Sequence, residues 1–222
     1  MNDQSRAVEI SERGRVPAQQ GAWTKRLYWD VFYSTDEPKE NLPVTHAEME
    51  GFRRHVLAAG ARTAIDVGSG WGLLATLMAR EGLRTVGYDW SPVAVDRART
   101  FWGEEKRLSF EVHDFLTQTP PRELVPGTVD VVACRLTLPY LDRHIAMADF
   151  RRWLKPRSGV LYLVVQVRER QQPGKERGFP HSVVEELRHG WRHSVRWDLD
   201  LPHAFTSVLG EFTALALTGP EG

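Results

Sequence analysis

The stretch AIDVGSGWG, residues 64–72, decides how the rest of this chain is interpreted. A short apolar run leads into an aspartate, and three glycines follow at alternate positions: Gly68, Gly70 and Gly72. An apolar run of this length is typical of a buried strand. Glycines directly after a strand let bare backbone approach a ligand, because glycine has no Cβ. The stretch therefore predicts a strand whose carboxyl end holds a nucleotide-like ligand.

The spacing of these glycines argues against a diphosphate. A dinucleotide-binding fingerprint has the pattern Gly-x-Gly-x-x-Gly, whose third glycine would fall where this chain has Leu73. Asp66 lies two residues before the first glycine, and its carboxylate would repel a phosphate but attract an ammonium group. The loop therefore favours a nucleoside that carries an amino acid, and it disfavours a nicotinamide dinucleotide.

Strand-like and helix-like segments alternate along the chain. Apolar strands are expected at 63–68, 84–89, 108–114, 129–136 and 159–167, with helices or turns between them. Two more strand-like segments, 194–203 and 210–219, are so close in sequence that they should pair antiparallel. This order predicts an α/β fold with a Rossmann-like, seven-stranded, mostly parallel sheet and a C-terminal antiparallel hairpin.

Helix starts are indicated by capping residues, whose side chains accept hydrogen bonds from the first backbone amides of a helix. The helix after the glycine loop should bury one apolar side. The expected caps are Thr45 in a capping box with Glu48, Ser91 before Pro92, Asp142, and Ser182 in a capping box with Glu185. The buried side of the helix after the glycine loop is expected to consist of Leu73, Leu74, Leu77 and Met78.

Composition narrows the classes of protein. A chain of 222 residues that is 41% hydrophobic has enough apolar side chains for one full-sized core. Its 29 basic and 29 acidic side chains cancel, so no general attraction to nucleic acid or an anionic membrane is expected. The single cysteine, Cys134, and a start without the apolar core of a signal peptide favour a cytoplasmic location. We expect a monomer or homodimer without nucleic-acid or membrane partners.

Taken together, the motifs resemble those of the class I S-adenosylmethionine-dependent methyltransferases. Residues 66–72, DVGSGWG, look like the first motif of that family, and Asp89 followed by Trp90 ends the second expected strand. Asp114 and Phe115 end the third, and VDVVACRL resembles the fourth-strand motif. Four landmarks in register on the right strand ends make the resemblance specific, and it extends over about residues 45–219.

The resemblance implies S-adenosyl-L-methionine as the cofactor and assigns residues to it. Asp89 falls where the family binds the ribose hydroxyls, although an aspartate there can also be a simple helix cap. Arg135, directly after the fourth strand, is a candidate for the methionine end, with a solvated arginine as the equal alternative. The full predicted set is Asp66, Gly68, Gly70, Gly72, Asp89, Trp90, Asp114, Phe115, Arg135 and Tyr33.

The polar start of the chain and the family resemblance together predict the domain organisation. Residues 1–20 are polar and are expected to form a flexible tail, and 21–222 a single methyltransferase domain. Within it, 21–60 should form an N-terminal helical lid and the first helix, and 61–222 the cofactor-binding core. YWDVFY at 28–33 resembles the segment that many small-molecule methyltransferases fold over the cofactor, so its aromatic rings can face the sulfonium or merely pack the helix.

The catalytic residues are the weakest part of the interpretation. Acceptors in such folds lie beyond the carboxyl ends of the strands, so the loop RLTLPYLDRH offers Tyr140 and His144. The ordinary pKa of histidine suits His144 to act as a general base, but an exposed helix histidine is the simpler explanation. Spacing and the missing third ligand argue against a zinc site at His189 and His193.

The expected reaction is methyl transfer from S-adenosylmethionine to an O, N or C atom of a small-molecule acceptor. The fourth strand is followed by Arg-Leu-Thr-Leu-Pro-Tyr and not by the Asn/Asp-Pro-Pro-Tyr motif of many enzymes that methylate amino groups of bases or glutamine. Two alternatives remain: a methyltransferase-like protein that transfers no methyl group, and, less favoured, an NAD(P)-dependent oxidoreductase.

Overall fold

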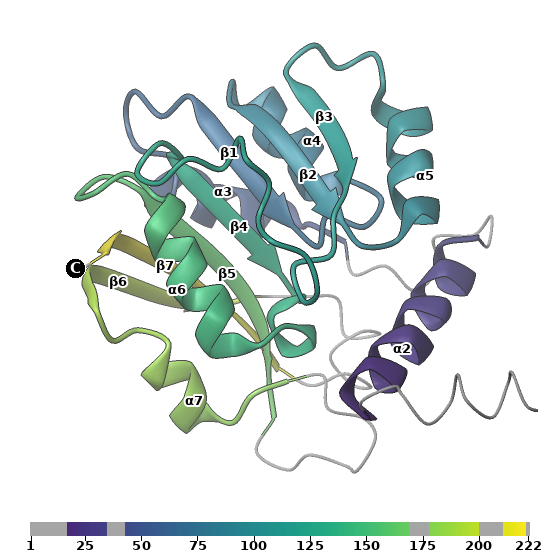
Figure 1. Cartoon of the computed structure of the whole chain (residues 1–222). Coiled ribbons are helices and arrows are strands. Elements are labelled where there is room, and N and C mark those ends of the chain that lie inside the picture. Colours follow the sequence, from purple (N-terminus) through teal and green to yellow (C-terminus); the bar gives the residue numbers. More distant parts are fainter. Residues whose placement is uncertain (1–16, 35–42, 169–177, 200–210, 221–222) are drawn as a thin grey trace, which may run out of the picture.

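The computed structural model describes residues 17–34, 43–168, 178–199 and 211–220, and they centre on one seven-stranded sheet (Figure 1). The strand order is β3-β2-β1-β4-β5-β7-β6. Strands β1 to β5 are parallel, and β7 runs antiparallel to both of its neighbours. The predicted Rossmann-like sheet with a C-terminal antiparallel hairpin is therefore confirmed. The strands are β1 (Thr63–Val67), β2 (Arg84–Asp89), β3 (Leu108–Val112), β4 (Val131–Arg135), β5 (Val160–Val167), β6 (Trp191–Asp198) and β7 (Glu211–Pro220).

Helices cover both faces of the sheet. Apolar side chains of α3 and α4 pack with those of β1, β4 and β5 in one core cluster, and α4 and α5 meet β3 in another. On the opposite face, α6 and α7 form a third cluster, and Figure 1 shows them in front of the sheet with α3 and α4 behind. The helices are α2 (Pro17–Ser34), α3 (His46–His55), α4 (Leu73–Arg80), α5 (Pro92–Trp102), the 3₁₀ turn η1 (Leu138–Tyr140), α6 (Arg143–Trp153) and α7 (His181–Glu186).

Three of the four predicted caps are confirmed. The Thr45 hydroxyl accepts from the Glu48 amide at 3.1 Å, and the Ser91 hydroxyl accepts from Ala94 at 3.2 Å. Asp142 accepts from the first amides of α6. The capping box at Ser182 is wrong, because α7 begins at His181 and the Glu185 carboxylate instead binds arginine side chains.

Several boundaries differ from the sequence-based expectation. Helix α2 begins at Pro17, inside the stretch that was predicted as tail. The helix α4 buries Leu74 and Met78, but Leu77 is only partly buried and Leu73 is 39% exposed, because these two lie on the same side of the helix as the exposed Arg80. Residues 200–203 of the expected 194–203 strand lie outside the described residues, and β6 itself begins earlier, at Trp191. None of the helices in the described part of the chain is long and apolar enough to cross a membrane.

Candidate cofactor site

The glycine loop lies at the switch point of the sheet. From β1, the chain proceeds outward to β2 and β3 on one side, while β4 and β5 lie on the other side. In open parallel sheets, ligands bind in the crevice outside the carboxyl ends of the strands where the order reverses. The loop that follows β1 occupies this position, so the fold itself places residues 68–72 at the natural ligand site.

The three glycines of the loop have different neighbours. All have positive φ angles, 75° at Gly68, 53° at Gly70 and 80° at Gly72, which L side chains rarely adopt. A Cβ at Gly68 would overlap the Thr137 side chain, and one at Gly72 would overlap the Phe110 ring. A Cβ at Gly70 would lie 2.7 Å from the hydroxyl oxygen of Tyr33. Gly68 and Gly72 thus permit close packing, and Gly70 faces the lid.

Asp66 is a buried carboxylate with an unused oxygen. Its side chain is 2% exposed, and among the described residues its Oδ1 atom has no hydrogen-bond partner. Burial raises the pKa of Asp66 to about 7, which the nearby charge of Arg135 partly counteracts and that of Asp89 reinforces. Such an oxygen costs free energy unless a ligand meets it, so its place beside the glycine loop suits a cationic group.

The Asp89 carboxylate joins its own strand end to the glycine loop. One carboxylate oxygen accepts from the Ser91 amide at 2.9 Å, as a local cap does, and the other accepts from the Gly70 amide at 2.9 Å. Burial raises the pKa of Asp89 to about 6 despite these bonds. A carboxylate has about four acceptor positions, so after the bonds from the Ser91, Gly70 and Trp90 amides it can still accept from a ligand such as a ribose.

The residues predicted for the adenine side have different surroundings in the structure. Trp90 is half-buried directly after Asp89. Asp114 uses its carboxylate locally, accepting from the Leu116 amide at 2.9 Å and from the Thr117 hydroxyl at 2.8 Å. The Phe115 ring packs against the core aromatics His113, Tyr88 and Trp153, with centroid distances of 4.5, 5.6 and 5.7 Å. Phe115 therefore contributes to the core that covers the α6 face.

The helix α2, which the sequence analysis assigns to a lid, packs against the glycine loop. The Tyr33 ring stacks on Trp29 with centroids 5.7 Å apart and lies 6.3 Å from Trp71 in the loop. Burial, together with Asp89, Tyr140 and Asp66, raises the pKa of Tyr33 well above its ordinary value, so its phenol stays protonated.

Two polar contacts tie the lid helix to α5. The Ser91 hydroxyl donates to the carboxylate of Asp30, and the Arg97 guanidinium donates to the Ser34 carbonyl at 2.9 Å. The second contact lies at the last residue of α2. The lid is thus held at the start of α5, directly above the strand end that carries Asp89.

The two predicted catalytic side chains lie in different surroundings. Tyr140, at the end of η1, meets the edge of the Trp29 ring at 5.6 Å and is close enough to Tyr33 to affect its pKa. His144 lies in the exposed first turn of α6, where its ring is 3.5 Å from the Arg143 guanidinium. Tyr140 therefore belongs to the aromatic group of Trp29, Tyr33 and Trp71, which we call the lid cluster, and His144 lies outside it.

Sequence reasoning missed Glu48, which is fully buried. Its carboxylate binds the Arg135 guanidinium at two points, 2.9 and 3.0 Å, and accepts from the Tyr162 hydroxyl at 2.9 Å. Arg135 is therefore neither solvated nor unpaired. The glutamate matched a capping box, in which its side chain would lie at the surface, so the pattern carried no signal for a buried role.

Thr137 was also missed. Its hydroxyl lies 3.3 Å from the Gly68 carbonyl and 3.2 Å from that of Arg135, which fixes the loop after β4 to the glycine loop. Leu136 just before it has a positive φ of 63°, a strained conformation that is often found at functional sites. Positive φ at a leucine has no sequence signature. Within the part of the chain that the structure describes, no group of three His, Cys, Asp or Glu side chains is arranged for a metal ion.

The residues that meet here fit S-adenosylmethionine. The unused oxygen of Asp66 suits its ammonium group, the remaining acceptor positions of Asp89 suit its ribose, and the loop backbone admits a close ligand at Gly70. A diphosphate would meet two buried carboxylates and would be repelled. The chemistry of the donor set therefore agrees with the cofactor that the motifs suggested.

Comparisons with known proteins agree with this geometry. Residues 65–163, from β1 to β5, match the family model described as a methyltransferase domain. No curated protein matches the chain. A chain of the Haloferax volcanii complex between the Trm112 methyltransferase activator and a methyltransferase is 22% identical with a TM-score of 0.68, over 89% of this chain and 98% of that one.

Two other solved structures share the fold. Haemonchus contortus phosphoethanolamine N-methyltransferase 1, in complex with phosphoethanolamine and S-adenosylhomocysteine, is 16% identical with a TM-score of 0.67, over 94% of this chain and 51% of that one. The [4+2]-cyclase SpnF is 18% identical with a TM-score of 0.60, over 78% of this chain and 80% of that one. Such low identities establish the fold alone. Residues 65–163 thus resemble a methyltransferase domain, and the chain has the Rossmann-like fold that the solved methyltransferase structures share.

Proposed function

We propose that the protein transfers the methyl group of S-adenosylmethionine to an O, N or C atom of a small-molecule acceptor. The observation that carries the proposal is the Oδ1 atom of Asp66, which is buried at the switch point of the sheet and lacks a partner among the described residues. A folded chain keeps such an oxygen at a cost, and a ligand ammonium group would offset it. When bound, S-adenosylmethionine supplies a methyl group on a sulfonium, which is already activated for in-line attack.

The chain's own residues would bind and orient the cofactor. Asp66 holds an ammonium group, and Asp89 accepts from a ribose diol while its bond to the Gly70 amide keeps the loop in place. Trp90 covers the base, and the Asp114 carboxylate, whose two oxygens retain acceptor positions, meets its amino group. Arg135 contributes through its charge, which favours the ionised form of the Asp66 carboxylate.

The lid supports a small acceptor. Tyr33, Trp29 and Tyr140 form a contiguous aromatic group over the glycine loop, and such rings exclude water and attract cations. Because its phenol stays protonated, Tyr33 can donate a hydrogen bond to an acceptor but cannot serve as a base at neutral pH. Tyr140 remains the better supported of the two catalytic candidates, because His144 lies on the exposed first turn of α6.

A second candidate is a domain that binds the cofactor without transferring its methyl group. The [4+2]-cyclase SpnF has the same fold, so this fold is compatible with other chemistry. The exposed position of His144 favours the same alternative, because it removes the most suitable general base from the buried site. Glycine spacing and the two carboxylates still disfavour an oxidoreductase.

Two measurements test the proposal. Calorimetry with S-adenosylhomocysteine and, in parallel, NADH should show binding of the first and none of the second. Incubation with methyl-labelled S-adenosylmethionine and a panel of small amines, phenols and carbon nucleophiles should then transfer label to one class. A protein that does not bind S-adenosylhomocysteine would contradict the cofactor assignment. A protein that binds it and labels nothing would favour the second candidate.

A further inference from the structure

Three neighbouring strands place a polar group beside the cofactor site. In the sheet register, Asp66 of β1 lies next to Ala133 of β4, which lies next to Tyr162 of β5. Neighbours in a parallel register share a face, and Arg135 shares it too, because it is two residues beyond Ala133. The small side chain of Ala133 leaves space between the larger side chains, and Glu48 of α3 enters this space from above.

Both carboxylate oxygens of Glu48 accept hydrogen bonds from this polar group. Its Oε1 atom accepts from the Arg135 Nε atom and the Tyr162 hydroxyl, and its Oε2 atom accepts from the Arg135 Nη2 atom. Nη2 also donates to the Pro43 carbonyl at 2.9 Å, just before α3. The guanidinium is therefore held in one place by a two-point ion pair, which is the strongest geometry for such a pair.

Asp66 is a second carboxylate with which the Arg135 guanidinium can interact. Arg135 already lowers the pKa of Asp66 through its charge. Both carboxylates are buried, but in the described part of the chain the Asp66 Oδ1 atom is left without a partner, whereas Glu48 binds Arg135 twice. A single buried arginine is thus committed to one of two available carboxylates.

We propose that Glu48 is a positioning residue of the cofactor site: by binding Arg135 it leaves the Asp66 carboxylate available for the ammonium group of the cofactor. This inference rests on the proposed function. Glu48 does not touch the cofactor in this account, and it acts only through Arg135.

Other groups around Asp66 do not replace this role. Asp89 faces it from β2, Cys134 from β4, and the phenols of Tyr33 and Tyr162 from α2 and β5. Arg135 is the only cation among the groups that act on the Asp66 charge in the described chain. When Glu48 is neutral, Arg135 loses its two-point ion pair, and Asp66 is a buried carboxylate on the same face of the sheet with which the guanidinium can then pair. Such pairing lowers the pKa of Asp66 and blocks its free oxygen.

The test is a double-mutant cycle. Calorimetry with S-adenosylhomocysteine is run from about pH 6 to pH 8.5 on the wild type, Glu48→Gln, Arg135→Gln and the double variant. We expect Glu48→Gln to weaken binding about tenfold and to remove its pH dependence near neutrality. The double variant removes both charges, so that no guanidinium is left to pair with Asp66, and we expect its affinity at the upper pH to return to within about threefold of the wild type.

The outcomes separate this inference from the proposed function. A wild type that does not bind contradicts the function. A wild type that binds while Glu48→Gln keeps both affinity and pH dependence overturns the positioning role. A double variant as weak as Glu48→Gln also overturns it, because Arg135 then contacts the ligand itself. If Glu48→Gln does not fold, Tyr162→Phe replaces it, since it removes one hydrogen bond to Glu48 without a charge; about threefold weaker binding is expected, and unchanged binding is contradictory.

Discussion

Two aspartates at opposite ends of the same sheet have opposite surroundings. Asp130 precedes β4 at the amino end, and it accepts from the Thr63 amide at 3.1 Å, the Thr63 hydroxyl at 2.9 Å and the Lys155 ammonium at 2.7 Å. Although its burial acts in the opposite direction, these bonds leave the pKa of Asp130 below its ordinary value. Asp66, near the carboxyl end of β1, is also buried, yet its pKa is raised to about 7.

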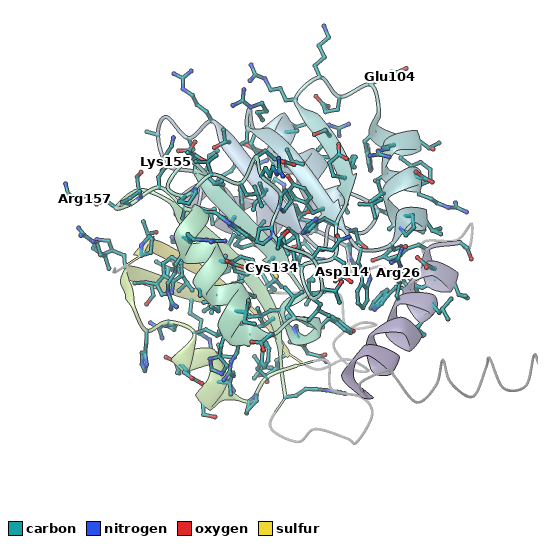
Figure 2. The ribbon with its side chains drawn as sticks, viewed as in Figure 1. Arg26, Glu104, Asp114, Cys134, Lys155 and Arg157 are labelled. Carbon is teal, nitrogen blue, oxygen red and sulfur yellow. The ribbon has the colours of Figure 1, made fainter. Side chains whose placement is uncertain are left out.

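The difference shows which end of the sheet is built for stability and which for binding. Figure 2 shows Lys155 at the far end of the strands from Asp114 and Arg26, which lie near the lid. At the Lys155 end, a carboxylate is satisfied by the protein itself and holds three segments together. At the lid end, carboxylates are kept buried with acceptor positions to spare, which is a cost that only a ligand offsets.

The largest expected effect is on stability and concerns Asp130, whose carboxylate is already paired within the protein. We expect Asp130→Asn to lower the free energy of unfolding by about 3 kcal/mol, because it breaks the Lys155 ion pair and leaves backbone amides without a charged acceptor. Urea unfolding measures this loss. Affinity for S-adenosylhomocysteine should be unchanged in the folded variant, and a loss of binding without a loss of stability would contradict the division between the two ends.

For Asp66, at the end of the sheet that would bind the ligand, we expect substitution to change the free energy of unfolding in the opposite direction. A carboxyl whose pKa is about 7 when folded and 3.8 as a free side chain stabilises the fold fully below pH 3.8, and this contribution is lost as pH rises through about 7. Asp66→Asn removes the buried charge, so at pH 8 it should raise the free energy of unfolding by about 2–3 kcal/mol. Urea unfolding at pH 5 and pH 8 tests this, since the gain should be smaller at pH 5.

Asp89 should show an intermediate effect confined to the ligand. We expect Asp89→Ala to weaken the binding of S-adenosylhomocysteine by about 1–3 kcal/mol, from lost charge-assisted hydrogen bonds and a looser Gly70 amide. Calorimetry measures it, and Asp142→Ala provides a matched comparison because that carboxylate also accepts from backbone amides, but as the cap of α6. Unchanged affinity in Asp89→Ala would leave Asp89 as a cap alone.

The smallest expected effect concerns the lid. Asp30→Asn weakens the contact with the Ser91 hydroxyl and should increase the dissociation rate of S-adenosylhomocysteine about threefold, with little change in association. Stopped-flow fluorescence can follow this through the tryptophans of the lid cluster. Asp149→Asn on the opposite face of the sheet is the control, and equal rates in both variants would argue against a latch.

The sequence predicted most of the fold but only part of the site. The glycine spacing, the strand alternation and the caps at Ser91 and Asp142 are local signals, and the structure confirms them. The buried role of Glu48 was not predicted, because a glutamate at this position suits an exposed capping box. Its burial depends on Arg135, 87 positions further along the chain. Phe115 lies in the motif at the right place, but the direction of its ring depends on Trp153 of α6. Tertiary contacts of this kind leave no local pattern.

The most direct test of the account is the titration of Asp66 itself. Protein labelled with ¹³C at the aspartate carboxyls, with Asp66→Asn for assignment, gives the midpoint for this group by NMR with and without S-adenosylhomocysteine. We predict a midpoint near the value of about 7 without ligand and a fall of at least about one pH unit when the ligand is bound. A midpoint near 4 without ligand, or one that does not move upon binding, would contradict the claim that Asp66 is held unsatisfied for the cofactor.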